Sequence, residues 1–150
     1  MPVTAFEFAN KIRAIDFTKE IEIVLSNPNT KAEIVELNQE QLYNSGIRSD
    51  GIELTPYVPQ TVLKKQAKGQ PYDHKTLKDT GIFYDGFYVE TQNAKYMVAS
   101  KDPKSIYLEE RNGLKIYGLT DANREIVWLN TVRPKVIKNV SDQTGLRYGV

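Results

Sequence analysis

One short stretch of the chain combines residue types that carry out hydrolysis in a known class of enzyme. Asp79-Thr80-Gly81 matches the core of the aspartic-protease signature, in which two such loops bring paired carboxylates together to share one proton. That loop should follow an apolar strand and precede a small hydroxyl residue, whereas here Lys78 comes before it and Ile82 after it. A peptidase would therefore need a homodimer to supply the second carboxylate. The alternative is a structural turn, in which Asp79 caps the backbone and Gly81 takes a positive φ.

The other reactive side chains do not form a recognisable site. Asp73-His74 contains the only histidine, and the chain has no cysteine. A structural metal site needs about four ligands of the His, Cys or carboxylate type, and one exposed loop histidine falls short of that number. We therefore expect no metal, no cofactor, no catalytic residue and no enzymatic activity.

Length and charge restrict the class of protein further. The chain of 150 residues has the size of one domain, so we predict a single domain over residues 1–150. With 20 Lys and Arg against 19 Asp and Glu, the net charge of +1 is not that of a dedicated nucleic-acid binder, and any contact with DNA must be local. No apolar run approaches the ~20 residues that span a bilayer, so we expect a soluble, unprocessed chain without a membrane partner.

The N-terminal part of the chain has the apolar spacing of amphipathic helices. Apolar residues recur every three or four positions over Ala5–Ser26, with a break expected at Phe17-Thr18. Thr30 and Glu33 have the spacing of a capping box, so a further helix is predicted to begin at Thr30 and to end at Ser45-Gly46.

The C-terminal half begins with a period of two and ends with helical spacing. Ile82–Thr91 and Lys95–Ser100 are predicted to form a β-hairpin, and Leu114–Tyr117 a last strand. Thr120 is a natural N-cap for a C-terminal helix, which Pro134 should kink or restart. The predicted fold class is α+β: N-terminal helices, a long extended loop, a small antiparallel sheet of a hairpin plus a strand, and a C-terminal helix packed on that sheet.

Residues 47–76, which we call the arm, separate these two halves and have little regular periodicity. They contain three prolines and a possible helical piece at Thr61–Ala67, and residues 64–78 carry five lysines against Asp73. Such a charged run is either a solvated face or a strip that meets DNA or a protein partner. The few apolar groups between Thr55 and Lys75 cannot offset the entropy of ordering about twenty residues, so we expect the arm to order against a neighbouring subunit. Subunit-interface candidates are Arg48, Tyr57, Lys64, Lys65 and Tyr72.

The order of these features resembles the neck or tail-completion proteins of tailed bacteriophages. Leu77, Thr80 and Gly81 occupy a Leu-x-x-Thr-Gly step into the first strand, and Tyr117-Gly118-Leu119-Thr120 occupies the step into the last helix. The resemblance covers about residues 35–140. The family often has a His and a Pro-Ala-Arg run before its last strand, where this chain has Leu108–Lys115. The Asn, Lys and Tyr usage also resembles that of crAss-like phages of gut Bacteroidetes.

The resemblance implies a non-enzymatic virion protein that forms a ring at the head–tail junction. Its partners would be copies of itself, the portal or connector, and tail proteins, with DNA passing through the channel without sequence-specific binding. An arm that orders on binding can wrap a large surface, as such a ring requires. The alternatives are the homodimeric aspartic-type peptidase and a small cytoplasmic protein-binding module.

Overall fold

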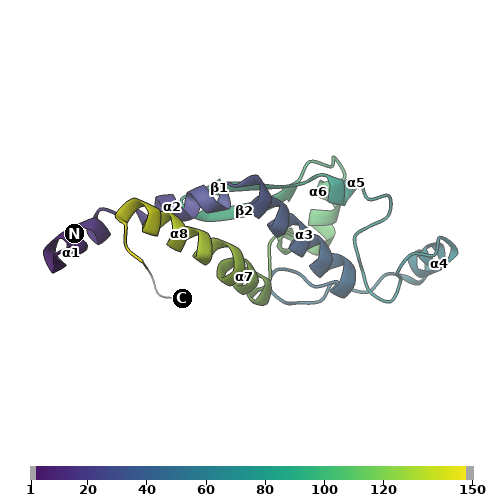
Figure 1. Ribbon diagram of the computed structural model, residues 1–150. Coiled ribbons are helices and arrows are strands. Elements are labelled where there is room, and N and C mark those ends of the chain that lie inside the picture. The colour runs from purple at the N-terminus through teal and green to yellow at the C-terminus, as the bar shows by residue number, and fades with distance from the viewer. Residues whose placement is uncertain (1–2, 148–150) are drawn as a thin grey trace.

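A computed structural model describes residues 3–147 as an elongated α+β structure, which confirms the predicted fold class (Figure 1). Its helices are α1 (Ala5–Arg13), α2 (Phe17–Leu25), α3 (Pro28–Ser45), α4 (Pro59–Ala67), α5 (Ile82–Asp85), α6 (Ser105–Asn112), η1 (Leu114–Ile116), α7 (Asp121–Val127), η2 (Trp128–Val132) and α8 (Arg133–Thr144). Strands β1 (Phe87–Gln92) and β2 (Lys95–Ser100) form the sheet. Figure 1 shows α1 and α4 projecting from opposite ends of the body. None of the helices in this range could cross a bilayer.

The N-terminal helices agree with the predicted spacing, and the first begins at Ala5 as predicted, but α2 and α3 begin at other residues than expected. The first break lies at Ala14–Asp16, two to three residues before the predicted one, because the Asp16 side chain caps α2 by accepting from the amide of Lys19. The capping box predicted at Thr30 is wrong. Asn27 is the N-cap of α3, and Pro28 holds the first helical position, where its fixed φ suits the helix and its missing N–H costs nothing. Gly46 ends α3 in the left-handed conformation, as predicted.

The predicted hairpin is confirmed, but its first strand is shorter than expected. β1 and β2 pair antiparallel, with Phe87 opposite Ser100 and Gln92 opposite Lys95. Residues 82–85 form α5 instead of extended strand, because the aromatic residues there pack on one another. The rings of Phe83 and Phe87 meet edge to face with centroids 5.0 Å apart.

The last strand predicted at residues 114–117 is wrong, since this segment is the 3-10 turn η1. Side chains of α3, and not a neighbouring strand, form hydrogen bonds with the backbone in and next to this segment. The buried Asn38 amide donates to the Ile116 carbonyl over 3.1 Å and accepts from the Gly118 amide over 2.8 Å. With those groups already satisfied, the segment has no ladder to join.

The C-terminal helix passes Pro134 without ending. Proline lacks the amide hydrogen and presses on the carbonyl four residues earlier, and the π-helical η2 widens the chain just before it. The buried valines show the insertion, since Val127 and Val132 are five residues apart whereas Val132, Val136 and Val140 follow at intervals of four. The extra residue in the π-helical turn therefore keeps the buried valines on the same side of the C-terminal helix, facing the body.

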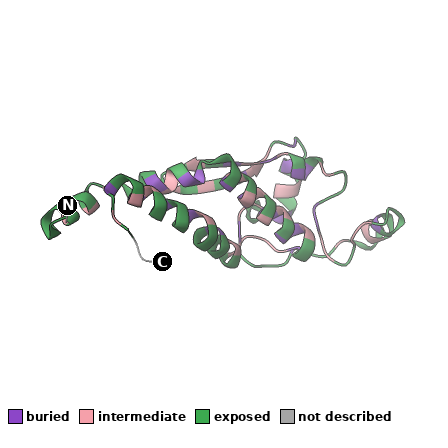
Figure 2. Cartoon of the chain, viewed as in Figure 1, coloured by how far each residue is buried: buried purple, intermediate pink, exposed green. Residues whose placement is uncertain are grey.

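The core lies where α2 and α3 pack on the hairpin and the C-terminal helix packs on α2 and α3 and not on the sheet as predicted (Figure 2). Its wholly buried side chains include Ile34 and Leu42 of α3 together with Ile116. Figure 2 shows the two projecting ends as mostly exposed, so the apolar core is confined to the middle of the molecule.

Candidate functional site

The arm is held to the body by a buried lysine. Lys65 lies on the inner side of α4 and is 6% exposed. Its Nζ donates to the carbonyl of Lys78 over 2.7 Å and lies 5.0 Å from the centroid of the Tyr57 ring. These partners are a neutral carbonyl and an aromatic face, so Lys65 anchors the arm while its charge has no carboxylate partner.

A tyrosine pair fixes the point where the arm returns to the body. Thr76 is wholly buried, and its amide donates to the Tyr57 hydroxyl over 3.0 Å. The Tyr84 hydroxyl donates to the Thr76 carbonyl from the opposite side. Burial raises the pKa of Tyr84 well above its ordinary value, which keeps that hydroxyl protonated as a donor. Tyr57 of the arm and Tyr84 of the body are thus both bonded to the backbone of Thr76.

Between α4, the returning arm and α6 lies a concavity of about 630 Å³, which we call the basic groove. The cations that line it are Lys64, Lys65, Lys68, Lys75, Lys78, Lys104 and Arg111. Its two acids are Asp79 and Asp102. The groove therefore carries a formal charge of +5 on a chain whose net charge is +1, so the remaining residues are net acidic.

Most of these cations have no carboxylate partner among residues 3–147. Within that range only Lys68 forms an ion pair, 2.9 Å from the Asp79 carboxylate, and that pair is exposed. Lys75 donates to the side chains of Thr55 and Asn112, both neutral. Lys78 lies over the ring of Tyr43 at 5.1 Å. The result is a concave surface with an uncompensated positive field.

Three groove cations make no side-chain hydrogen bond, ion pair or cation–π contact to any residue in the range 3–147. They are Lys64 on α4, and Lys104 and Arg111 on the facing side at α6. Tyr107 lies between the latter two in sequence, lines the groove and is 65% exposed. These groups are available to a ligand from two opposing walls.

The structure brings some of the predicted interface residues together and separates others. Tyr57, Lys64 and Lys65 all line the basic groove. Arg48 lies instead at the corner after α3, where its guanidinium pairs with Asp50 over 2.6 Å. That hydrogen bond lowers the pKa of Asp50 to about 2. Tyr72 is 47% exposed beyond the end of α4 and does not line the groove.

The Asp79-Thr80-Gly81 turn forms part of the groove wall. Gly81 has a φ of 93°, in the left-handed region predicted for it, and begins α5. The hydrogen bond from Lys68 lowers the pKa of Asp79, whereas a proton-sharing dyad raises the pKa of one of its carboxyls. Asp79 thus serves as an ion-pair partner between the arm and the body in the single chain. His74, the other candidate for chemistry, lies with Nε2 2.5 Å from the Tyr43 carbonyl and Nδ1 2.9 Å from Asp73.

The sequence reasoning missed the α6 wall of the groove. Lys104, Tyr107 and Arg111 are spaced three and four residues apart, which places them on one helical face. That spacing was a usable signal. What could not be inferred was that this face lies opposite α4, because the intervening residues give no indication of how the arm returns.

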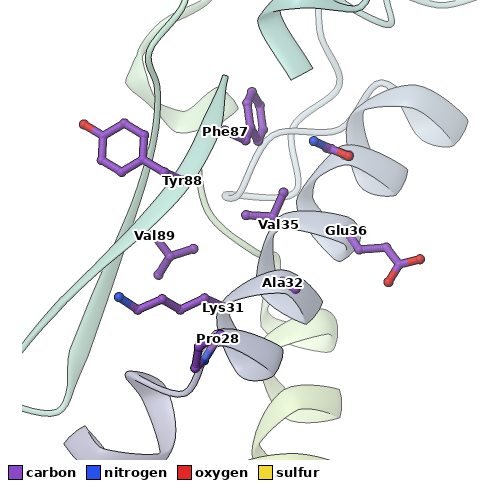
Figure 3. Close-up of a pocket in the computed structure, with 9 residues that line it drawn as sticks. Pro28, Lys31, Ala32, Val35, Glu36, Phe87, Tyr88 and Val89 are labelled. Carbon is purple, nitrogen blue, oxygen red and sulfur yellow. The ribbon is translucent and has the colours of Figure 1, made fainter. Parts of the chain in front are cut away.

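A second concavity, of about 620 Å³, lies between α3 and β1 (Figure 3). In Figure 3, Val35 and the stem of Lys31 extend from α3 toward the strand that carries Val89, while Glu36 points away. Its one base and one acid, Lys31 and Glu36, leave no net charge, and its other lining groups provide no cluster of reactive side chains. The basic groove is therefore the better candidate for a functional site.

Comparison of the chain with protein-family models, with curated proteins and with solved structures finds no match in any of the three.

Proposed function

We propose that the chain is a virion structural protein that forms a ring at the head–tail junction of a tailed phage. In this role it joins the portal or connector to the tail and surrounds the DNA channel, without catalysing a reaction. The proposal rests on the resemblance of Leu77–Gly81 and Tyr117–Thr120 to the neck and tail-completion family. The observation that supports it best is the shape of the subunit, in which two short helices project from opposite ends (Figure 1).

The N-terminal projection is a helix that cannot be stable alone. α1 has nine residues and buries none of them, and Phe6 is 73% exposed. Isolated helices shorter than about 12–15 residues are marginal in water. In the described chain, α1 is tied to the body by a hydrogen bond from Lys11 to the carbonyl of Thr144. A neighbouring copy that covers Phe6 would supply the missing burial.

The opposite projection carries exposed apolar groups of its own. Val58, the N-cap residue of α4, is 64% exposed, and Leu63 within α4 is 66% exposed. A subunit that presents different surfaces at its two ends makes head-to-tail contacts, and such contacts close into a ring when the rotation between copies allows it. We infer that the end carrying α4 meets the end carrying α1 in the next copy.

Imaging of the assembled particle tests this function. A reconstruction of purified virions should place many copies of the chain in a closed ring between portal and tail. Leu63→Ser should reduce its incorporation into particles, whereas Met97→Ser, at a comparably exposed position on the sheet, should not. A single copy per virion, or its absence from the virion, defeats the proposal and favours the cytoplasmic binding module. Peptide cleavage that disappears in Asp79→Asn would instead support the peptidase.

A further inference from the structure

We propose that the basic groove binds single-stranded nucleic acid through its phosphodiester backbone. This inference goes beyond the proposed ring and does not depend on it. It rests on three observations: positive charge is concentrated in one concave surface, most of that charge has no carboxylate partner in the described part of the chain, and aromatic groups lie beside it.

The charge distribution favours a polyanion as the occupant. The groove holds a formal charge of +5, and its cations come from the region of α4, from the returning segment that carries Lys75 and Lys78, and from the region of α6. A concave surface lined by one sign of charge concentrates its field and attracts a ligand of the opposite sign. Each phosphate neutralised by a lysine or arginine also releases condensed counterions, which adds to the affinity.

The residue types favour nucleic acid over an acidic protein segment. Lysine is depleted at protein–protein interfaces and arginine is enriched, whereas the groove contains six lysines and one arginine. Lysine binds phosphate as a point charge on a flexible stem and does not require fixed bidentate geometry. The composition therefore favours the phosphate backbone of a nucleic acid over an acidic protein segment.

The aromatic groups favour a single strand over a duplex. Tyr107 is 65% exposed on the α6 wall, and Tyr57 lines the opposite wall beside Lys65. Unpaired bases stack on such rings without regard to sequence, and a strand whose bases are paired cannot use them.

Fluorescence anisotropy with the full chain and a labelled oligothymidylate of about twelve nucleotides tests the proposal. The test variant is Lys64→Gln with Lys104→Gln and Arg111→Gln, which removes the three cations without side-chain partners in residues 3–147. The matched control is Lys19→Gln with Lys95→Gln and Lys135→Gln, at exposed positions outside the groove. Circular dichroism of both variants checks that the fold is retained.

The wild type should bind the single strand, with an affinity that falls as salt rises from about 50 to 200 mM. The test variant should bind about tenfold or more weakly, and the slope of log K against log salt should fall by about 2, as expected for three lost phosphate contacts. The control variant should match the wild type. Tyr107→Ala should weaken binding by about tenfold with little change in slope, because it removes stacking and no charge.

Four results would overturn the inference. They are no binding of the single strand at low salt, an equal loss in the control variant, a glutamate polymer that binds as tightly as the oligonucleotide, and a duplex of the same length that binds more tightly than the single strand. The third result would indicate an acidic protein partner, and the fourth would indicate backbone contacts without stacking.

Discussion

Single residues set the conformation of the groove wall, and Gly81 is the clearest case. Its φ of 93° lies in the region that side chains with a Cβ rarely adopt, and a Cβ there would meet only the Lys78 Cε, at 3.8 Å. Gly81→Ala should therefore lower the free energy of unfolding by roughly 1 kcal/mol through backbone strain and not through a clash. Urea denaturation measures the change. Gly81→Asn is the control and should lose less, because asparagine tolerates a positive φ better than alanine.

A second residue-scale prediction concerns Tyr84, whose hydroxyl donates to the buried Thr76 carbonyl. Tyr84→Phe leaves that carbonyl without its donor and should cost about 1–3 kcal/mol at neutral pH. Burial raises the folded pKa of Tyr84 above the unfolded value of about 10. Its contribution is thus fully present below pH ~10 and is lost as the pH rises toward the folded pKa.

Urea midpoints at about pH 8 and pH 10.5 measure this dependence. The wild type should lose more stability between the two than Tyr84→Phe does. Tyr117, whose pKa is also raised by burial, should leave the variant with a residual loss. Equal losses in the two proteins would show that Tyr84 titrates as it does in the unfolded chain.

At the scale of elements, the arm was identified from sequence but its attachment was not. The helical piece predicted at Thr61–Ala67 is α4, because a proline start and a run of helix formers determine it locally. The burial of Lys65 could not be foreseen, since a lysine in a charged run is ordinarily solvated. It depends on the Lys78 carbonyl, which lies in a different segment. The sequence of α4 itself therefore determines that it is a helix. Its position on the body depends on a contact with a distant segment.

Contacts between distant segments also explain why some elements were predicted wrongly. Asn38 and Gln41 of α3 bond the backbone around Gly118, so the segment that begins at Leu114 became a turn although its sequence alternates like a strand. Conversely, the hairpin was predictable because Phe87–Gln92 and Lys95–Ser100 pair with each other across a two-residue turn. When side chains of another element bond a backbone segment in place of a neighbouring strand, the sequence of that segment does not show it.

Hydrogen exchange tests how firmly the arm is held. α4 has few apolar contacts with the body, so its amides in residues 59–67 should exchange rapidly in the free chain and be protected in the assembled particle. The amides of α3, which buries Ile34 and Leu42, should be protected in both and serve as the internal control. Strong protection of α4 in a verified monomer would show that the arm packs on its own domain, and the assembly role of the arm would then be wrong.

At the scale of the whole molecule, the two ends differ in chemistry although the net charge is only +1. One end carries the basic groove and α4, and the other carries α1, which buries no residue. The net charge is therefore close to zero although the charge is unevenly distributed over the surface. A ring built from such subunits could present a local basic surface without a strong overall attraction for DNA that passes through its channel.

Deletion of residues 3–14 tests whether α1 is needed for assembly but not for folding. The cut leaves Asp16 to cap α2 and removes no buried side chain, so the free energy of unfolding should change by less than about 1 kcal/mol. If α1 forms the proposed contact with the next copy, the truncated chain should nevertheless be missing from purified particles, because that contact surface is gone. Thermal unfolding and quantitative mass spectrometry of particles measure the two effects. Normal incorporation of the truncated chain would exclude α1 from the subunit contact, and unfolding of the truncated chain would show that α1 stabilises its own domain.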